Sequence, residues 1–112
     1  MTVAEIQSAL KLTTFAESDT ERTVTGGYTG DLLSWVMGRA TADEAWVTIM
    51  SNRNIVAVAT LTDVAMIVLA EGVQPDGGVA ELAREKGINL YGSEQPSFAL
   101  SAAIDRLLRN GV

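Results

Sequence analysis

The sequence predicts an α/β fold in which helices cover both faces of a short, mostly parallel sheet. Three nearly continuous apolar runs occupy residues 45–50, 65–69 and 88–91, and each ends within a few residues at Ser, Asn or Gly. Runs of this length and composition are typical of strands that are buried on both faces. Helical patterns alternate with them, which indicates parallel strands joined by helices in a three-layer α/β/α arrangement.

The chain is expected to begin with a helix. Thr2 and Glu5 have the spacing of a capping box, in which each side chain binds the backbone amide of the other. The apolar residues of this helix share one face: Ile6, Ala9 and Leu10. Residues 13–25 are rich in threonine and charge, which predicts a loop and an edge strand, with residues 22–25 as the best strand in the segment.

A glycine-rich segment at residues 26–30 predicts a break in regular structure before a helix that Asp31 caps. The apolar residues of that helix are expected to share a face: Leu32, Leu33, Val36 and Met37. A Walker phosphate loop would need a Gly-Lys-Ser/Thr sequence at this point, and Asp31 has the wrong chemistry for it. The segment is therefore interpreted as a tight turn.

Residues 55–62 are ambiguous, because their Ile, Val and Thr side chains favour a strand. A strand here would form a hairpin with residues 45–50, but the connecting residues 51–54 contain no glycine. A helix capped by Asn52 or Asn54 would instead form a crossover between parallel strands. We therefore predict a helix over residues 55–62, against their propensity.

Two further helices are expected in the last third of the chain. Asp76 is predicted to cap a helix over residues 79–86, and Gly87 is predicted to stop it. The final helix, over residues 97–109, has one apolar stripe: Leu100, Ile104, Leu107 and Leu108.

Composition excludes several kinds of chemistry. The 112 residues suffice for one domain, and they include neither His nor Cys, which rules out an imidazole base, a thiol nucleophile and a disulfide. The net charge is −6 and the basic residues are scattered, which argues against nucleic-acid binding. The first residues do not resemble a signal peptide, and the longest apolar stretch, residues 55–70, is too short for a bilayer and contains Asp63. We expect a soluble, cytoplasmic protein.

Most of the chain resembles a known family. Residues 27–33, 46–59, 65–72 and 86–88 together are similar to a DRTGG domain, a module found alone, in some phosphotransacetylases and in certain regulated pyrophosphatases. The family's Asp-Arg pair falls on Asn52-Arg53, and its Thr-Gly-Gly falls on residues 70–72, so that Arg and the last Gly are kept. The resemblance implies a single domain over residues 1–112, a fold like the N-terminal domain of HPr kinase/phosphorylase, a regulatory role and a homodimer.

Three predicted loops are expected to meet at one edge of the sheet. They are residues 51–54, 71–76 and 92–97, which follow the strands at the edge where parallel α/β sheets bind ligands and where helix N-termini attract anions. Arg53 is the natural bidentate partner for a phosphate or carboxylate there. The candidate ligand-binding residues are Asn52, Arg53, Asn54, Glu71, Gly72, Asp76 and Ser93. In the alternative interpretation, the asparagines and Asp76 only cap helices and Arg53 pairs with an acid.

The sequence thus predicts a non-catalytic regulatory or sensor module that acts as a homodimer. Its ligand would be an adenine nucleotide or another small anion, bound without a cofactor or a metal. The alternative is an interaction subunit of a larger metabolic or redox enzyme complex with no ligand of its own. Neither interpretation involves a nucleic acid or a membrane.

Overall fold

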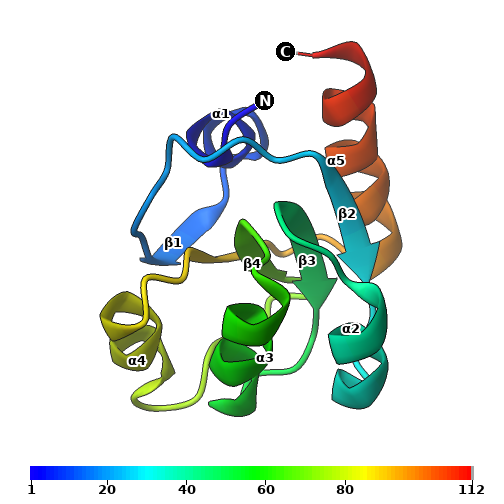
Figure 1. Ribbon diagram of the computed structural model, residues 1–112. Coiled ribbons are helices and arrows are strands. Elements are labelled where there is room, and N and C mark those ends of the chain that lie inside the picture. The colour runs from blue at the N-terminus through cyan, green and yellow to red at the C-terminus, as the bar shows by residue number, and fades with distance from the viewer. Residues whose placement is uncertain (112) are drawn as a thin grey trace.

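The computed structural model describes residues 1–111 and has the predicted three-layer architecture, with a five-stranded sheet between two layers of helices (Figure 1). The strands are β1 (Thr13–Ala16), β2 (Gly26–Thr29), β3 (Glu44–Thr48), β4 (Met66–Leu69) and β5 (Leu90–Gly92). The helices are α1 (Val3–Leu10), α2 (Leu33–Arg39), α3 (Asn54–Thr62), α4 (Val79–Glu85) and α5 (Ser97–Asn110). The three apolar runs coincide with β3, β4 and β5, as predicted.

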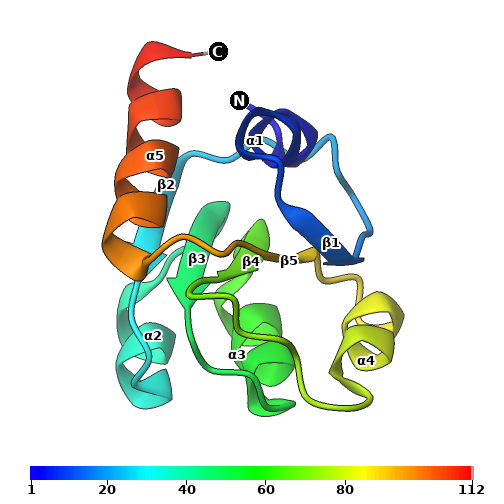
Figure 2. The ribbon, with the colours of Figure 1, turned by 180° about the vertical axis from the view of Figure 1, so that it is seen from behind.

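Strands β2 to β5 lie in the sheet in the same order as in the chain. The spatial order is β1-β5-β4-β3-β2, in which β2, β3, β4 and β5 are parallel and β1 is antiparallel to β5. Right-handed crossovers that all advance in one direction place their helices on one face of the sheet. Accordingly, α2, α3 and α4 cover one face, whereas α1 and α5 cover the other (Figures 1 and 2).

The sheet separates two apolar cores, because successive side chains of a strand point to opposite faces. Trp46 of β3 and Ile67 of β4 are paired in register and belong to the core under α2, α3 and α4. Their neighbours Val47 and Val68 belong to the core under α1 and α5, together with Tyr91 of β5. Burial on both faces explains why these strands are apolar at nearly every position.

The ambiguous segment is helical, as the crossover argument predicted. The helix α3 begins at Asn54, with Arg53 at the N-cap position. Asn52 provides the capping interaction from one residue earlier, because its Oδ1 accepts a hydrogen bond of 2.9 Å from the backbone N–H of Asn54. Five of its nine residues are buried, so packing against the sheet and the neighbouring helices outweighs the β propensity of the segment.

The edge strand predicted within residues 13–25 is present, but it is β1 (Thr13–Ala16) and not the segment expected. Residues 22–25 are not a strand: only Thr23 forms an isolated bridge, to Thr2, and Val24 packs into the core beneath α1 and α5. The glycine-rich segment, expected to break regular structure, instead forms β2 by pairing in parallel with β3. Its extended conformation is imposed by the neighbouring strand, not by the preferences of its own residues.

Of the other three predicted N-terminal caps, one is right and two are wrong. The capping box of Thr2 and Glu5 is present. Asp31 does not cap α2: its Oδ1 accepts hydrogen bonds from Thr48 Oγ1 at 2.8 Å and from the backbone N–H of Ile49 at 2.9 Å. The side chain of Asp76 does not cap α4, whose N-cap is Gly78. Both aspartates instead connect neighbouring loops.

The predicted apolar face of α2 is only partly buried. Val36 is buried and Leu33 packs against the core, but Leu32 and Met37 are exposed. The helix α4 ends just before Gly87, as predicted. Gly87 has a φ of 71°, in the left-handed region that favours glycine and that ends a helix.

Asn89 connects β5 to the loop that precedes β2. It is only 3% exposed. Its Oδ1 accepts from the backbone N–H of Ser18 at 2.7 Å, and its Nδ2 donates to the carbonyl oxygens of Asp19 at 2.9 Å and Ala65 at 3.0 Å.

Replacing Asn89 by alanine should therefore lower the free energy of unfolding by about 2–4 kcal/mol, because it leaves buried backbone groups without partners. Asn110→Ala, at an exposed position, should change it by less than about 0.5 kcal/mol. Urea denaturation monitored by tryptophan fluorescence measures both. Equal effects of the two substitutions would contradict the role of Asn89.

The phenol of Tyr91 is buried and donates a hydrogen bond of 2.8 Å to Glu17 Oε2. Burial of the phenol, and to a smaller extent this hydrogen bond, raises the pKa of Tyr91 well above its usual range. In the unfolded chain the phenol ionises near pH 10, so the unfolded state releases the proton first and stability should fall as the pH rises above about 10.

Tyr91→Phe should remove this part of the alkaline loss of stability, at the cost of a lower stability at neutral pH. Urea denaturation midpoints measured from about pH 8 to pH 11 test the difference. An identical alkaline slope in the two proteins would show that another group is responsible.

Candidate functional site

The three predicted loops do meet at the carboxyl ends of β3, β4 and β5, and they are joined by backbone hydrogen bonds. The N–H of Glu71 donates to the carbonyl of Gln95 at 2.8 Å, and that of Gly72 donates to the carbonyl of Ser93 at 2.9 Å. The N–H of Asp76 donates to the carbonyl of Ser51 at 2.9 Å. The polar backbone of this edge is thus largely engaged within the loops.

Side chains strengthen these connections. Ser51 Oγ donates to Asp76 Oδ1 at 2.9 Å, and Glu71 Oε2 accepts from the backbone N–H of Ser97 at 3.1 Å. Gly72 has a φ of 73°, and a Cβ at this position would overlap the carboxylate of Glu94. The positive φ favours glycine at position 72, whereas the exposed side chain of Glu94 can move away from a Cβ.

The remaining cavity at this edge is small. It has a volume of about 20 Å³ and is lined by residues that include Gly72, Ser93 and Glu94. Such a space holds about one water molecule. Of the predicted ligand-binding residues, Glu71, Gly72, Asp76 and Ser93 are therefore placed close together, but at an edge that carries carboxylates and offers little room.

Arg53 and Asn54 lie elsewhere, in a groove between α3 and α4. The groove has a volume of about 490 Å³. Its lining residues are Arg53, Asn54, Val56, Ala57, Thr60, Leu61, Leu82 and Lys86. Asn52 does not line the groove; its Oδ1 accepts a hydrogen bond from the backbone N–H of Asn54 and its carbonyl accepts one from the N–H of Ile55. The seven predicted residues thus divide between two places on the surface.

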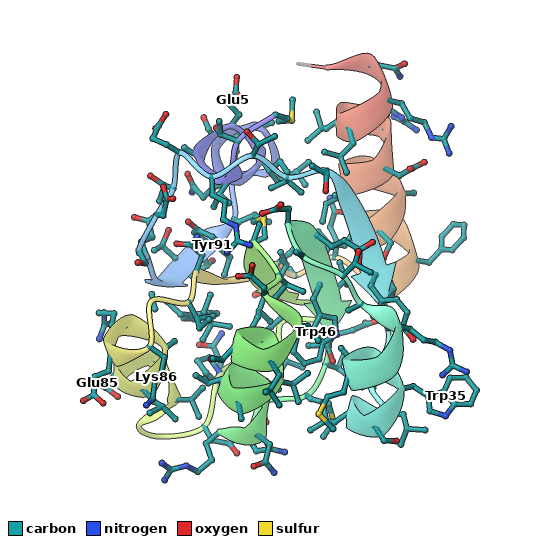
Figure 3. The ribbon with its side chains drawn as sticks, viewed as in Figure 1. Glu5, Trp35, Trp46, Glu85, Lys86 and Tyr91 are labelled. Carbon is teal, nitrogen blue, oxygen red and sulfur yellow. The ribbon has the colours of Figure 1, made fainter. Side chains whose placement is uncertain are left out.

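The groove is positively charged although the chain has a net charge of −6. Its lining contains two cations, Arg53 and Lys86, and no carboxylate. In the part of the chain that the structure describes, neither cation forms an ion pair, whereas Arg22 binds Asp43 and Asp63. Figure 3 shows Lys86 on the side of α4 nearer to α3, with Glu85 on the outer side of that helix.

Sequence reasoning did not find Lys86 and Leu82 as part of this groove. Leu82 belongs to α4 and Lys86 is its C-cap residue, some thirty positions after Arg53, and only the packing of α3 beside α4 brings them together. One signal was available: α3 has no charged residue between Asn54 and Thr62. A helix on the outside of a domain that lacks a charged face often has a partner there.

A second cavity, of about 200 Å³, lies between β2, β3 and α5. Its polar side chains already have partners: Thr29 Oγ1 lies 2.6 Å from Ser101 Oγ, and Asp105 accepts from Nε of Arg109, which lies outside the lining, at 2.8 Å. Nothing at this cavity indicates the charge of a ligand.

Two kinds of feature are absent from residues 1–111: a cluster of metal ligands and a membrane-spanning helix. Within residues 1–111, no group of three or more acidic side chains is placed to hold a metal ion. No helix of this described part is both long and apolar enough to cross a bilayer.

The fold is shared with a protein of known structure. It is similar to the crystal structure of the CBS and DRTGG domains of the regulatory region of Clostridium perfringens pyrophosphatase, complexed with the activator diadenosine tetraphosphate. The TM-score is 0.71 at 18% sequence identity, over 91% of this chain and 45% of that one. The chain thus spans less than half of its neighbour, and the similarity shows a shared fold. No family model and no curated protein matches the sequence.

Because Arg53 and Lys86 have no ion-pair partner among the described residues, they should contribute little to stability. Arg53→Ala and Lys86→Ala should each change the free energy of unfolding by less than about 0.5 kcal/mol. Asp76→Ala, which removes the acceptor of Ser51, should cost about 1 kcal/mol. Thermal denaturation of the three variants tests this, and a large loss with Arg53→Ala would indicate a structural role for that side chain.

Proposed function

We propose that this protein is a non-catalytic regulatory module that binds a small anionic ligand, such as an adenine nucleotide, in the groove between α3 and α4. The observation that carries the proposal is a pair of cations, Arg53 and Lys86, that have no ion-pair partner within residues 1–111 and line a groove to which these residues contribute no carboxylate, in an acidic chain. We further propose that the module acts as a homodimer.

The groove offers both parts of a nucleotide site. The guanidinium of Arg53 presents parallel N–H donors to a phosphate, and the ammonium of Lys86 adds a second positive charge. The apolar side chains of Leu61 and Leu82 give a surface on which a base can lie. The backbone at the start of α3 adds the positive end of a nine-residue helix beside Arg53.

The edge at the carboxyl ends of the strands is the less favourable place for an anion. Glu71, Asp76 and Glu94 bring negative charge there, and the loops already bind one another. In this proposal, Gly72, Asp76 and Ser93 shape the loops, Asn52 positions the start of α3, and Arg53 and Asn54 contact the ligand. The structural neighbour, a regulatory region crystallised with a nucleotide activator, supports a nucleotide as the first ligand to test.

The test is a thermal denaturation series with ATP, ADP, AMP, diadenosine tetraphosphate and pyrophosphate. A ligand at a hundred times its Kd adds about 2.7 kcal/mol, which raises the melting temperature of a chain of this size by roughly 10 °C. Arg53→Ala and Lys86→Ala should each weaken binding about tenfold or more.

Arg106→Ala is the matched control, since Arg106 is an exposed arginine of α5 outside the groove and should leave binding unchanged. Stabilisation that survives both groove variants would place the ligand elsewhere. No stabilisation by any of the compounds would favour an interaction subunit without a ligand of its own.

A further inference from the structure

The two cations of the groove belong to opposite ends of two parallel helices. Arg53 is the N-cap residue of α3, and Lys86 is the C-cap residue of α4. Each helix connects two parallel strands, so it runs from the carboxyl end of one strand back to the amino end of the next. The helices therefore point the same way, and Figures 1 and 2 show them side by side.

The starts of these helices are held at the same level. The backbone N–H of Asp76, two residues before the N-cap of α4, donates at 2.9 Å to the carbonyl of Ser51, two residues before the N-cap of α3. From Gly78 to Lys86 the helix α4 then advances about 12 Å, at 1.5 Å per residue. The backbone positions of Arg53 and Lys86 are therefore separated by about this length along the groove.

The section of the groove between the two cations is uncharged. Within residues 1–111 it is lined by Ala57, Thr60, Leu61 and Leu82, and Leu61 is 74% exposed. The hydroxyl of Thr60 donates to the carbonyl of Val56 at 2.9 Å, so its one donor is already used. The middle of the groove thus offers apolar surface to a ligand, whereas its side-chain charges lie toward the two ends.

At the start of α3, an anion would be bound by side chains and not by the backbone. The backbone N–H of Asn54 donates to Asn52 Oδ1 at 2.9 Å. The N–H of Ile55 donates to the carbonyl of Asn52 at 3.2 Å. Because these first amides of the helix are engaged, the donors for an anion at this end are those of the Arg53 guanidinium, with the Asn54 amide beside it.

A ligand whose charge is concentrated in one place cannot use this arrangement fully. The phosphates of ADP and ATP are joined in one chain on one side of the nucleoside, so they bring charge to one end of the groove only. A nucleoside with phosphates on two sides of its ribose can give each cation its own charge-assisted hydrogen bonds. Its uncharged part then lies on the apolar middle section.

We propose that the ligand of this groove carries two separate anionic groups on either side of an uncharged part, as a nucleoside 3′,5′-bisphosphate does. One group binds Arg53 at the start of α3, and the other binds Lys86 at the end of α4. The inference rests on the proposed ligand site and names the class of ligand that the site takes.

The test compares adenosine 3′,5′-bisphosphate with ADP and ATP by isothermal titration calorimetry, in a buffer without divalent cations. ADP has the same number of phosphates, and ATP has about the same total charge, so the three ligands separate the placement of the phosphates from their number and charge. The bisphosphate should bind at least about tenfold more tightly than either of the others.

Variants of the two cations show whether the phosphates are divided between them. Arg53→Ala and Lys86→Ala should each abolish the preference, so that the three ligands bind within about threefold of one another. Lys86→Arg keeps a positive charge at the end of α4 and should keep the preference. Arg106→Ala, at an exposed position outside the groove, should also keep it.

The outcomes separate this inference from the proposed function. Equal binding of the three ligands to the unaltered protein, weakened by Arg53→Ala and Lys86→Ala, would overturn the two-anion ligand and leave the proposed site intact. A preference that survives in either alanine variant would also overturn the inference, because the phosphates would not be divided between the two cations. Failure of all three ligands to bind would overturn both the inference and the proposed nucleotide ligand.

Discussion

The four parallel strands, β2 to β5, lie in the sheet in the order in which they occur in the chain. The positions of the helices follow from this order. Crossovers that are right-handed and advance in one direction place α2, α3 and α4 side by side on one face. The other face is then left for α1 and α5, which come from the two ends of the chain. Each of the central strands is covered by helices on both faces. For this reason the successive residues Trp46 and Val47, which point to opposite faces, can both be apolar.

The same winding determines where the surface is hollowed and where apolar side chains stay exposed. In doubly wound sheets a crevice opens at the point where the strand order reverses. The parallel strands here have no such reversal, and their loops bind each other, as the hydrogen bond between Ser51 and Asp76 illustrates. Space is instead found between neighbouring crossover helices, where Arg53 and Lys86 lie beside apolar side chains. The winding also leaves β2 at the end of the sheet, beside the exposed Trp35.

Sequence reasoning predicted the features that depend on double burial and chain order. It identified β3, β4 and β5 from their apolar runs and α3 from the need for a crossover. It did not predict β2, because this strand is stabilised by its pairing with β3 and its glycines have no preference of their own for an extended conformation. It also predicted the wrong role for Asp31. The carboxylate of this residue accepts a hydrogen bond from Thr48 of β3, seventeen positions later in the chain, and does not cap the adjacent helix α2. The loops at the sheet edge were correctly expected to meet, but the position of Arg53 depends on the packing of α3 beside α4, which no local pattern encodes.

The most direct test of the central claim is to map the ligand by amide chemical shifts in an NMR titration of the full chain with ATP. The largest shifts should occur along α3 and in the last turn of α4, and they should saturate together. The amides of β1 and α1 should be unaffected. Shifts confined to residues 71–76 and 92–97 would contradict the account, because they would place the anion at the carboxyl ends of the strands and not between the helices.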